Sequence, residues 1–115
     1  MSGEFESCLS RLVEQIKKEK MDVVKSWIKD YRGKIINLKT PVKAFHIVFT
    51  VNDVSLRIGE YPSSEATYRG DEKVLIEILK GETRGPDEVR KGRLKLWGSL
   101  NEALTFERIA KTIKV

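Results

Sequence analysis

The side chains of this chain that could do chemistry are one histidine, one cysteine and a set of carboxylates. His46 is the only imidazole and Cys8 the only thiol among the 115 residues. A nucleophilic Ser or Cys needs a base beside it, and a zinc site needs a cluster of Cys and His ligands. His46 stands in an alternating apolar stretch, and Cys8 on an apolar helical stripe. We therefore expect both to be structural, with no catalytic residue, no metal and no cofactor.

The carboxylates and glycines do not form a catalytic or nucleotide-binding pattern either. Glu14, Asp22, Glu72 and Glu77 stand among lysines and arginines, as on solvated helix faces. Neither a GxxxxGK[ST] nor a GxGxxG motif occurs. Nucleotide binding is not indicated.

The composition is that of one globular domain, with 40% hydrophobic and 34% charged residues. The apolar runs are too short to cross a bilayer, and no signal-peptide pattern opens the chain. A single cysteine allows no internal disulfide. We expect a cytoplasmic protein.

The net charge of +5 is distributed evenly along the chain. Residues 1–34 carry 8 basic and 6 acidic groups, residues 35–70 carry 4 and 3, and residues 71–115 carry 10 and 8. Nucleic-acid binders usually gather basic side chains on one face, with aromatic residues between them if the strand is single. The sequence shows no such stripe, so we expect no nucleic-acid partner.

Two kinds of hydrophobic periodicity divide the chain into elements. Spacing of i, i+3, i+4 from Phe5 to Tyr31 predicts one long amphipathic helix or two abutting ones, with Gly33 as the C-cap of an N-terminal segment over 1–33. Period-two alternation predicts a strand at 43–51, covered at least in part on both sides. A tight turn at Asn52-Asp53 joins it to a second strand at 54–61.

Further strands and helices follow from the same signals. A short strand is expected at 65–68, and another at 35–38 at the sheet edge. Asp71 can cap a helix that ends at Gly81, and Pro86 suits the first turn of a short helix that ends near Gly92. A strand at 93–97 precedes the last helix. Leaving the edge strand aside, the predicted order is α-β-β-β-α-α-β-α, which favours an α+β fold.

The ordered set of elements from Asp71 onward resembles the sterol carrier protein family of non-specific lipid-transfer domains. The matching features are a helix ending in glycine, a second short helix, the strand Gly92-x-Leu94-x-Leu96-x-Gly98 and an amphipathic C-terminal helix. The likeness spans about residues 35–115 and is weaker in the hairpin. It implies a single domain over 1–115 with a five-stranded, mostly antiparallel sheet and helices over one face.

The resemblance also implies a hydrophobic tunnel between the sheet and the C-terminal helix that holds a sterol, fatty acid, acyl-CoA or phospholipid. The family's ligand-binding positions match residues of the helix that ends at Gly81, of the strand at 93–97 and of the last helix. Three further residues are added because they share one face of the strand at 43–51. The expected ligand-binding residues are Phe45, Ile47, Phe49, Leu75, Ile78, Leu79, Leu94, Leu96, Leu100, Ala103 and Leu104. Each of them is also an ordinary candidate for the core.

Basic residues between Leu79 and Leu94 are interleaved with acidic ones. We expect Arg84, Arg90 and Lys91 to meet anionic headgroups, including those of a membrane surface in transient contact. The alternative for these cations is a solvated surface. For the domain as a whole, the alternative is an accessory or regulatory role in which an apolar groove binds a partner helix or peptide.

Overall fold

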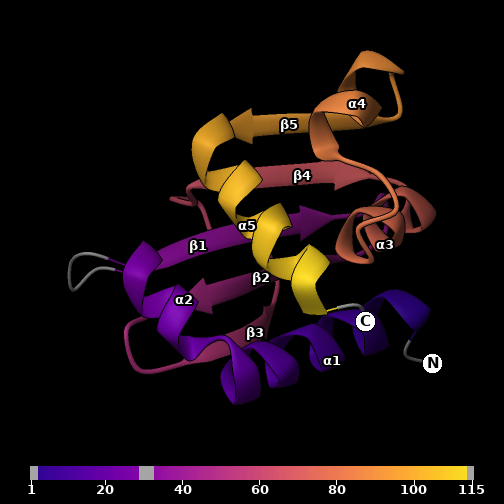
Figure 1. Ribbon diagram of the computed structural model, residues 1–115. Helices are drawn as coiled ribbons and strands as arrows, with labels where there is room; N and C mark the ends of the chain where they lie inside the picture. The colour runs from indigo at the N-terminus through magenta and orange to yellow at the C-terminus, as the bar shows by residue number, and fades with distance from the viewer. Residues whose placement is uncertain (1–2, 29–32, 114–115) are drawn as a thin grey trace.

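The computed structural model describes residues 3–28 and 33–113, and it forms two layers. One layer is a five-stranded sheet, and the helices lie on one of its faces (Figure 1). The strands are β1 (Lys34–Lys39), β2 (Ala44–Phe49), β3 (Val54–Ile58), β4 (Ala66–Gly70) and β5 (Leu94–Gly98). The helices are α1 (Glu4–Glu19), α2 (Met21–Trp27), α3 (Glu72–Leu79), α4 (Gly85–Arg90) and α5 (Leu100–Ile113). The predicted α+β class is confirmed.

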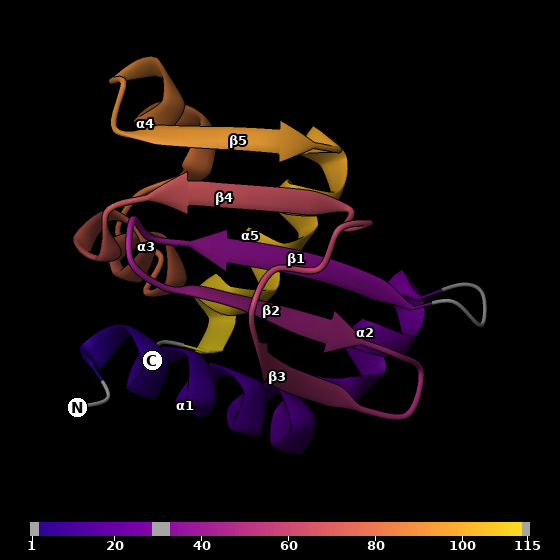
Figure 2. The ribbon, with the colours of Figure 1, turned by 180° about the vertical axis from the view of Figure 1, so that it is seen from behind.

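The strand order is β3-β2-β1-β4-β5, so β1 lies in the middle of the sheet. Its predicted place at the edge is wrong. The connection from β3 to β4 crosses the sheet, and β4 then pairs with β1 in parallel, whereas all other neighbours are antiparallel (Figure 2). Period-two alternation marks a strand but does not encode its position in the sheet. With β1 and both N-terminal helices included, the order is α-α-β-β-β-β-α-α-β-α.

The N-terminal segment forms two abutting helices. Lys20 is both the C-cap of α1 and the N-cap of α2, and the apolar stripe of α1 is buried, Phe5 and Cys8 included. The predicted cap at Gly33 is wrong because the helix ends earlier: Ile28, with ψ 101, has already left the helical region. Tyr31 lies outside the described residues.

The core between the two layers is built on aromatic contacts. Phe45, Ile47 and Phe49 point from β2 toward the helices and are buried. Phe5 meets Phe45 edge to face, with ring centroids 5.7 Å apart, and Phe49 and Tyr68 both meet Phe106 of α5 in the same way. These rings fill the space between the sheet and α5.

Among residues 3–28 and 33–113, no helix lies on the opposite face of the sheet, which is crossed by the β3–β4 connection (Figure 2). Asn37 of β1 holds this connection: its Nδ2 donates to the Tyr61 carbonyl at 2.8 Å, and its Oδ1 accepts from the Tyr61 amide at 2.9 Å. The His46 ring lies against Tyr61, with Nδ1 2.9 Å from the carbonyl oxygen of Gly59. Both faces of β2 are therefore covered at least in part, as predicted.

The second half of the chain follows the predicted elements closely. Asp71 is the N-cap of α3, although its side chain makes no capping hydrogen bond, and Gly81 (φ 76) follows the helix. Pro86 is in the first turn of α4. The start of α5 is anchored by Glu102, which accepts hydrogen bonds from Trp27 Nε1 at 3.0 Å and from Lys34 Nζ. Within the described residues, we find no helix with the length and apolar content that a membrane span requires.

Candidate functional site

A cavity of about 290 Å³ lies between the α3–α4 connection and the outer side of α5. Its wall combines two apolar side chains, three cations and one buried carboxylate. The lining residues are Ile78, Gly81, Thr83, Arg84, Leu104, Glu107, Arg108 and Lys111. Its volume is at the lower end of the roughly 300–1,000 Å³ typical of small-molecule sites.

Two glycines let the α3–α4 connection approach α5. Gly81 has φ 76, which glycine adopts without strain, and a Cβ there would meet Lys111 Cγ at 2.9 Å. A Cβ on Gly85 would lie only 2.5 Å from Glu107 Oε2. The stem of Lys111 and the carboxylate of Glu107 therefore occupy space that larger residues at 81 and 85 would need.

Glu107 is the buried polar centre beside this cavity, with an exposed fraction of 8%. Its Oε2 accepts from the Tyr68 hydroxyl at 2.6 Å, and its Oε1 accepts from the Gly85 amide at 2.9 Å. Burial raises the pKa of Tyr68 far above its usual range, and the negative charge of Glu107 raises it further. Tyr68 therefore stays protonated and acts as a hydrogen-bond donor that joins β4 to α5.

Glu88 is a second buried carboxylate and fixes α4 against β5. Arg93 Nε donates to Oε1 at 2.6 Å, and Thr83 Oγ1 donates to Oε2 at 2.5 Å. The hydrogen bond from Arg93, followed by that from Thr83, lowers the pKa of Glu88 from 4.5 to about 2. Both buried carboxylates thus have structural partners. The partners of Glu107 are neutral, so the cavity holds the charge of this carboxylate together with the three cations Arg84, Arg108 and Lys111.

The exposed side of α5 changes from apolar to cationic along its length. Leu100 is 52% exposed, Leu104 lines the cavity one turn later, and Arg108 and Lys111 follow on the same side. Arg84 faces them from the α3–α4 connection. Within residues 3–28 and 33–113, no carboxylate forms an ion pair with Arg84, Arg108 or Lys111.

The predicted ligand-binding residues fall into three groups by exposure. Phe45, Ile47, Phe49, Leu75, Ile78, Leu79, Leu94 and Ala103 are buried in the core. Leu96 and Leu104 are partly buried, and Leu100 is exposed. Only Ile78 and Leu104 among them line the cavity. Aromatic side chains pack between the sheet and α5, and the tunnel expected there stays a prediction.

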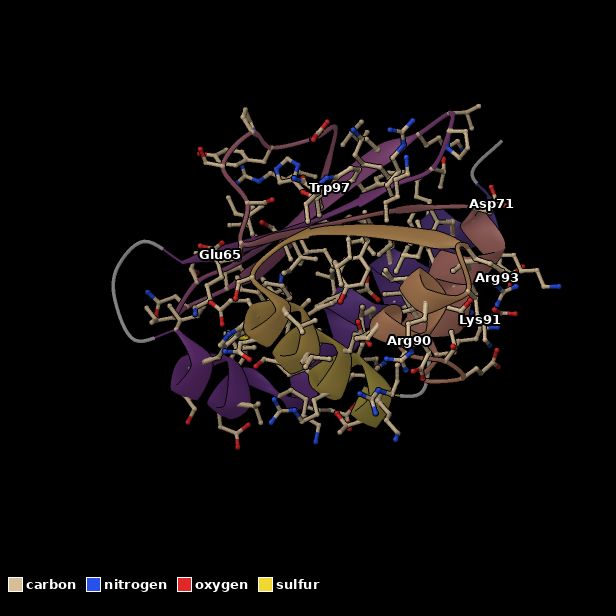
Figure 3. The ribbon with its side chains drawn as sticks, turned by 90° about the horizontal axis from the view of Figure 1, so that it is seen from above. Glu65, Asp71, Arg90, Lys91, Arg93 and Trp97 are labelled. Atoms are coloured by element: carbon tan, nitrogen blue, oxygen red, sulfur yellow. The ribbon has the colours of Figure 1, made fainter. Side chains whose placement is uncertain are left out.

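The predicted headgroup cations are divided by the structure. Arg84 lines the cavity, whereas Arg90 pairs with Asp87 and Lys91 lies 3.6 Å from Glu88 (Figure 3). Sequence reasoning missed Arg108 and Lys111. Their spacing of four and seven residues from Leu104 places all three on one helical face, and this signal was available in the sequence.

His46 and Cys8 are structural, as expected. A carbonyl oxygen only accepts, so His46 Nδ1 donates to Gly59, and the side chain is 8% exposed. Cys8 is fully buried in α1, and this burial raises the pKa of its thiol. Among the described residues, no group of three or more His, Cys, Asp or Glu side chains is arranged to hold a metal ion.

No protein-family model matches the sequence, and no curated protein sequence matches it. Solved structures do match. A ubiquinone synthesis protein described as UbiJ-SCP2 has a TM-score of 0.71 and 15% identity, with 98% of this chain and 95% of that chain covered. Sterol carrier protein-2 like-3 from Aedes aegypti has a TM-score of 0.64 and 14% identity, with 93% of this chain and 96% of that chain covered.

Sterol carrier protein 2 from Yarrowia lipolytica has a TM-score of 0.61 and 17% identity, covering 91% of this chain and 88% of that chain. These likenesses extend over nearly the whole chain, N-terminal helices included. The sheet order, the helical layer on one face and these matches lead to one conclusion: the chain has the sterol carrier protein fold.

Proposed function

We propose that this chain is a single-domain cytoplasmic protein that binds an amphipathic lipid with an anionic headgroup, and that it carries the lipid without chemical change. One observation supports this proposal most strongly. The cavity beside α5 joins apolar Leu104 and Ile78 to the cations Arg84, Arg108 and Lys111. A fatty acid or another single-chain anionic lipid has the same division between a chain and a charged end.

The headgroup lies at the cationic end, where Arg and Lys donate charge-assisted hydrogen bonds to a carboxylate or phosphate. The chain runs over Leu104 toward Leu100, and the remainder of a longer chain enters between α5 and the sheet only when α5 moves away from the sheet. Each buried methylene contributes about 0.8 kcal/mol, so even a partly covered chain binds well. The free energy of transferring the lipid between the protein and a membrane is then close to zero, which allows the protein to take up and release the lipid.

The likeness in fold supports a lipid ligand in general terms. Two of the matching structures are named as sterol carrier proteins, and a third is named for ubiquinone synthesis. The chemistry-bearing residues support a binding role, because His46 and Cys8 are both occupied in packing.

A comparison of palmitate with hexadecanol, by native mass spectrometry and calorimetry, tests this proposal. The triple variant Arg84→Gln/Arg108→Gln/Lys111→Gln should weaken palmitate binding by about 3-fold to 150-fold, because each exposed ion pair contributes about 0.2–1 kcal/mol. Hexadecanol has no charge, so its binding should not change. Leu104→Asn should weaken both ligands.

The double variant Arg90→Gln/Lys91→Gln is the matched control, since both cations already pair with carboxylates. It should bind palmitate like the unmodified protein. The proposal fails if neither ligand binds, or if the triple variant loses both ligands equally.

A further inference from the structure

Five cations lie near one corner of the sheet, where β1 and β4 end and where β2, β5 and α3 begin. Lys39, Arg69 and Lys95 stand directly opposite one another on the adjacent strands β1, β4 and β5. Lys43 follows the β1–β2 turn, and Lys73 lies in the first turn of α3. We call Lys39, Lys43, Arg69, Lys73 and Lys95 the basic corner.

The basic corner is short of negative charge. Lys39 pairs with Glu60 at 2.7 Å, but within the described residues no ion pair joins Lys43, Arg69, Lys73 or Lys95 to a carboxylate. Like charges directly opposite on neighbouring strands destabilise a sheet. The arrangement of Arg69 beside Lys95 therefore lowers stability in the free protein, and an anionic partner would relieve it.

Three of these five cations, Arg69, Lys73 and Lys95, line a depression. It has a volume of about 530 Å³, and Pro41, Arg69, Lys73 and Lys95 are among its lining residues. Asp71 is the one carboxylate in its lining, and the Arg93 guanidinium at its rim contacts Glu88 and Glu77. Lys73 also lines a neighbouring depression with Glu4, Glu72, Glu77 and Glu82, so the positive charge of this hollow comes mainly from Arg69 and Lys95.

Two exposed apolar side chains lie next to these cations. Val42, at the tip of the β1–β2 turn between Pro41 and Lys43, is 86% exposed. Trp97 is 48% exposed and lies on the same face of β5 as Lys95, opposite the helices (Figure 3). Indole rings favour the interface between water and lipid, and an aliphatic tip fits the edge of the hydrocarbon.

We propose that the basic corner docks this protein onto an anionic bilayer surface, with Val42 and Trp97 at the lipid interface. This inference rests on the proposed lipid-binding function, because docking would hold the carrier where lipids are exchanged. Helix α3 links the two sites: Lys73 lies at its start, and Ile78 of the cavity lies near its end. Eight residues at 1.5 Å each separate the two ends by about 12 Å.

A membrane suits this surface better than a single-stranded nucleic acid. Sequence-independent strand binding needs a continuous basic groove with successive aromatic platforms. Here the β3–β4 connection crosses the open face and interrupts such a path (Figure 2). Val42, next to Lys43 in the chain and 86% exposed, offers no ring on which a base could stack, and Trp97 is a single exposed indole on β5.

Vesicle sedimentation tests the docking. We expect the ligand-free protein to bind vesicles of phosphatidylcholine mixed with phosphatidylglycerol and not to bind vesicles of phosphatidylcholine alone. It should dissociate from the mixed vesicles as the salt concentration is raised. Each basic residue at an anionic surface increases binding about fivefold, so Arg69→Gln/Lys95→Gln should reduce the partition coefficient by about 25-fold. Val42→Ser should weaken it further.

The control variant Lys18→Gln/Lys25→Gln removes the same charge from exposed positions on α1 and α2 and should bind the mixed vesicles normally. Arg69→Gln/Lys95→Gln should be at least as stable as the unmodified protein, since it removes repulsion between opposite cations. Unfolding then cannot explain its loss of binding.

The docking proposal is overturned if the protein does not bind the mixed vesicles, or if the test and control variants lose vesicle binding equally. It is also overturned if the protein binds an oligouridine as tightly as it binds the mixed vesicles and Arg69→Gln/Lys95→Gln abolishes both. Palmitate binding measured without vesicles is a separate readout. A protein that binds palmitate but not vesicles refutes the docking alone, and one that binds vesicles but not palmitate refutes the proposed lipid cargo alone.

Discussion

At the scale of single residues, two buried carboxylates organise the part of the molecule that carries the cavity. Glu107 joins α5 to Tyr68 of β4 and to the start of α4, and Glu88 joins α4 to Arg93 before β5. Buried carboxylates are costly unless hydrogen bonds satisfy them. Both are fully engaged, so the walls of the cavity are set by a structural network.

Gly85→Ala should destabilise the protein because its Cβ would lie 2.5 Å from Glu107 Oε2. Overpacking of this kind costs about 1–3 kcal/mol, which urea denaturation would measure. Val89→Ala on the same helix is the control, and it should stay within about 0.5 kcal/mol because Val89 is largely exposed. An unchanged midpoint for Gly85→Ala would show that Glu107 is free to move.

The pKa of Glu88 predicts a loss of stability in acid. The pKa of its carboxyl is about 2 in the folded protein and 4.5 for an ordinary glutamate, so its stabilisation is present above pH 4.5 and disappears as the pH falls toward 2. Glu88→Gln should therefore destabilise the protein at pH 7 and much less at pH 3. Denaturant titrations at both pH values measure this difference.

Glu82→Gln, at an exposed position on the same α3–α4 connection, is the control for this pH effect. It should follow the unmodified protein at both pH values. A Glu88→Gln penalty that is the same at pH 3 and pH 7 would contradict the prediction.

At the scale of elements, the connection between β3 and β4 decides the sheet order. It carries the chain across β2 and β1, and Asn37 holds it to the sheet through both backbone groups of Tyr61. Helix α5 has a double role, because Ala103, Phe106 and Ala110 are buried in the core while its other side lines the cavity.

Asn37→Ala should weaken the attachment of the β3–β4 connection to the sheet. It leaves the Tyr61 amide and carbonyl without their side-chain partners, which costs about 1–3 kcal/mol. Hydrogen exchange at the Tyr61 amide should quicken, together with a lower denaturation midpoint. Asn101→Ala, at an exposed position on α5, should change neither quantity. Unaltered exchange at Tyr61 in Asn37→Ala would show that the connection is held by other contacts.

At the scale of the whole molecule, the sheet and the helical layer pack directly against each other. The radius of gyration is 12.9 Å, close to the value of about 13 Å expected for a folded domain of this size. A lipid chain longer than the cavity can hold therefore needs α5 to move from the sheet. The cavity and the basic corner lie toward the two ends of α3.

Ligand binding should stabilise the folded state. At a palmitate concentration of 100 times Kd, the gain is about 2.7 kcal/mol, visible as a higher Tm. Leu104→Asn should lose most of this gain at the same palmitate concentration. Hydrogen exchange should slow in α5 and in the connection that contains Gly81 and Gly85. Protection confined to α1 and α2 would place the ligand elsewhere.

The sequence by itself determined the type and approximate bounds of most elements, because periodicity, glycines and Pro86 act locally. The helices around Leu75 and Leu104, the strand Leu94–Gly98 and the structural roles of His46 and Cys8 were all predictable in this way. The ordered set of elements was also enough to suggest the sterol carrier protein fold, which the structural matches confirm.

Only the tertiary structure decided what depends on contacts between distant residues. It placed β1 in the middle of the sheet, which no local pattern encodes, and it paired Arg90 and Lys91 with carboxylates while leaving Arg84 at the cavity. It also collected basic residues that are evenly spread along the chain into one corner. Charge counts along a sequence are one-dimensional, whereas strand pairing brings residues as far apart as Lys39 and Lys95 to the same surface.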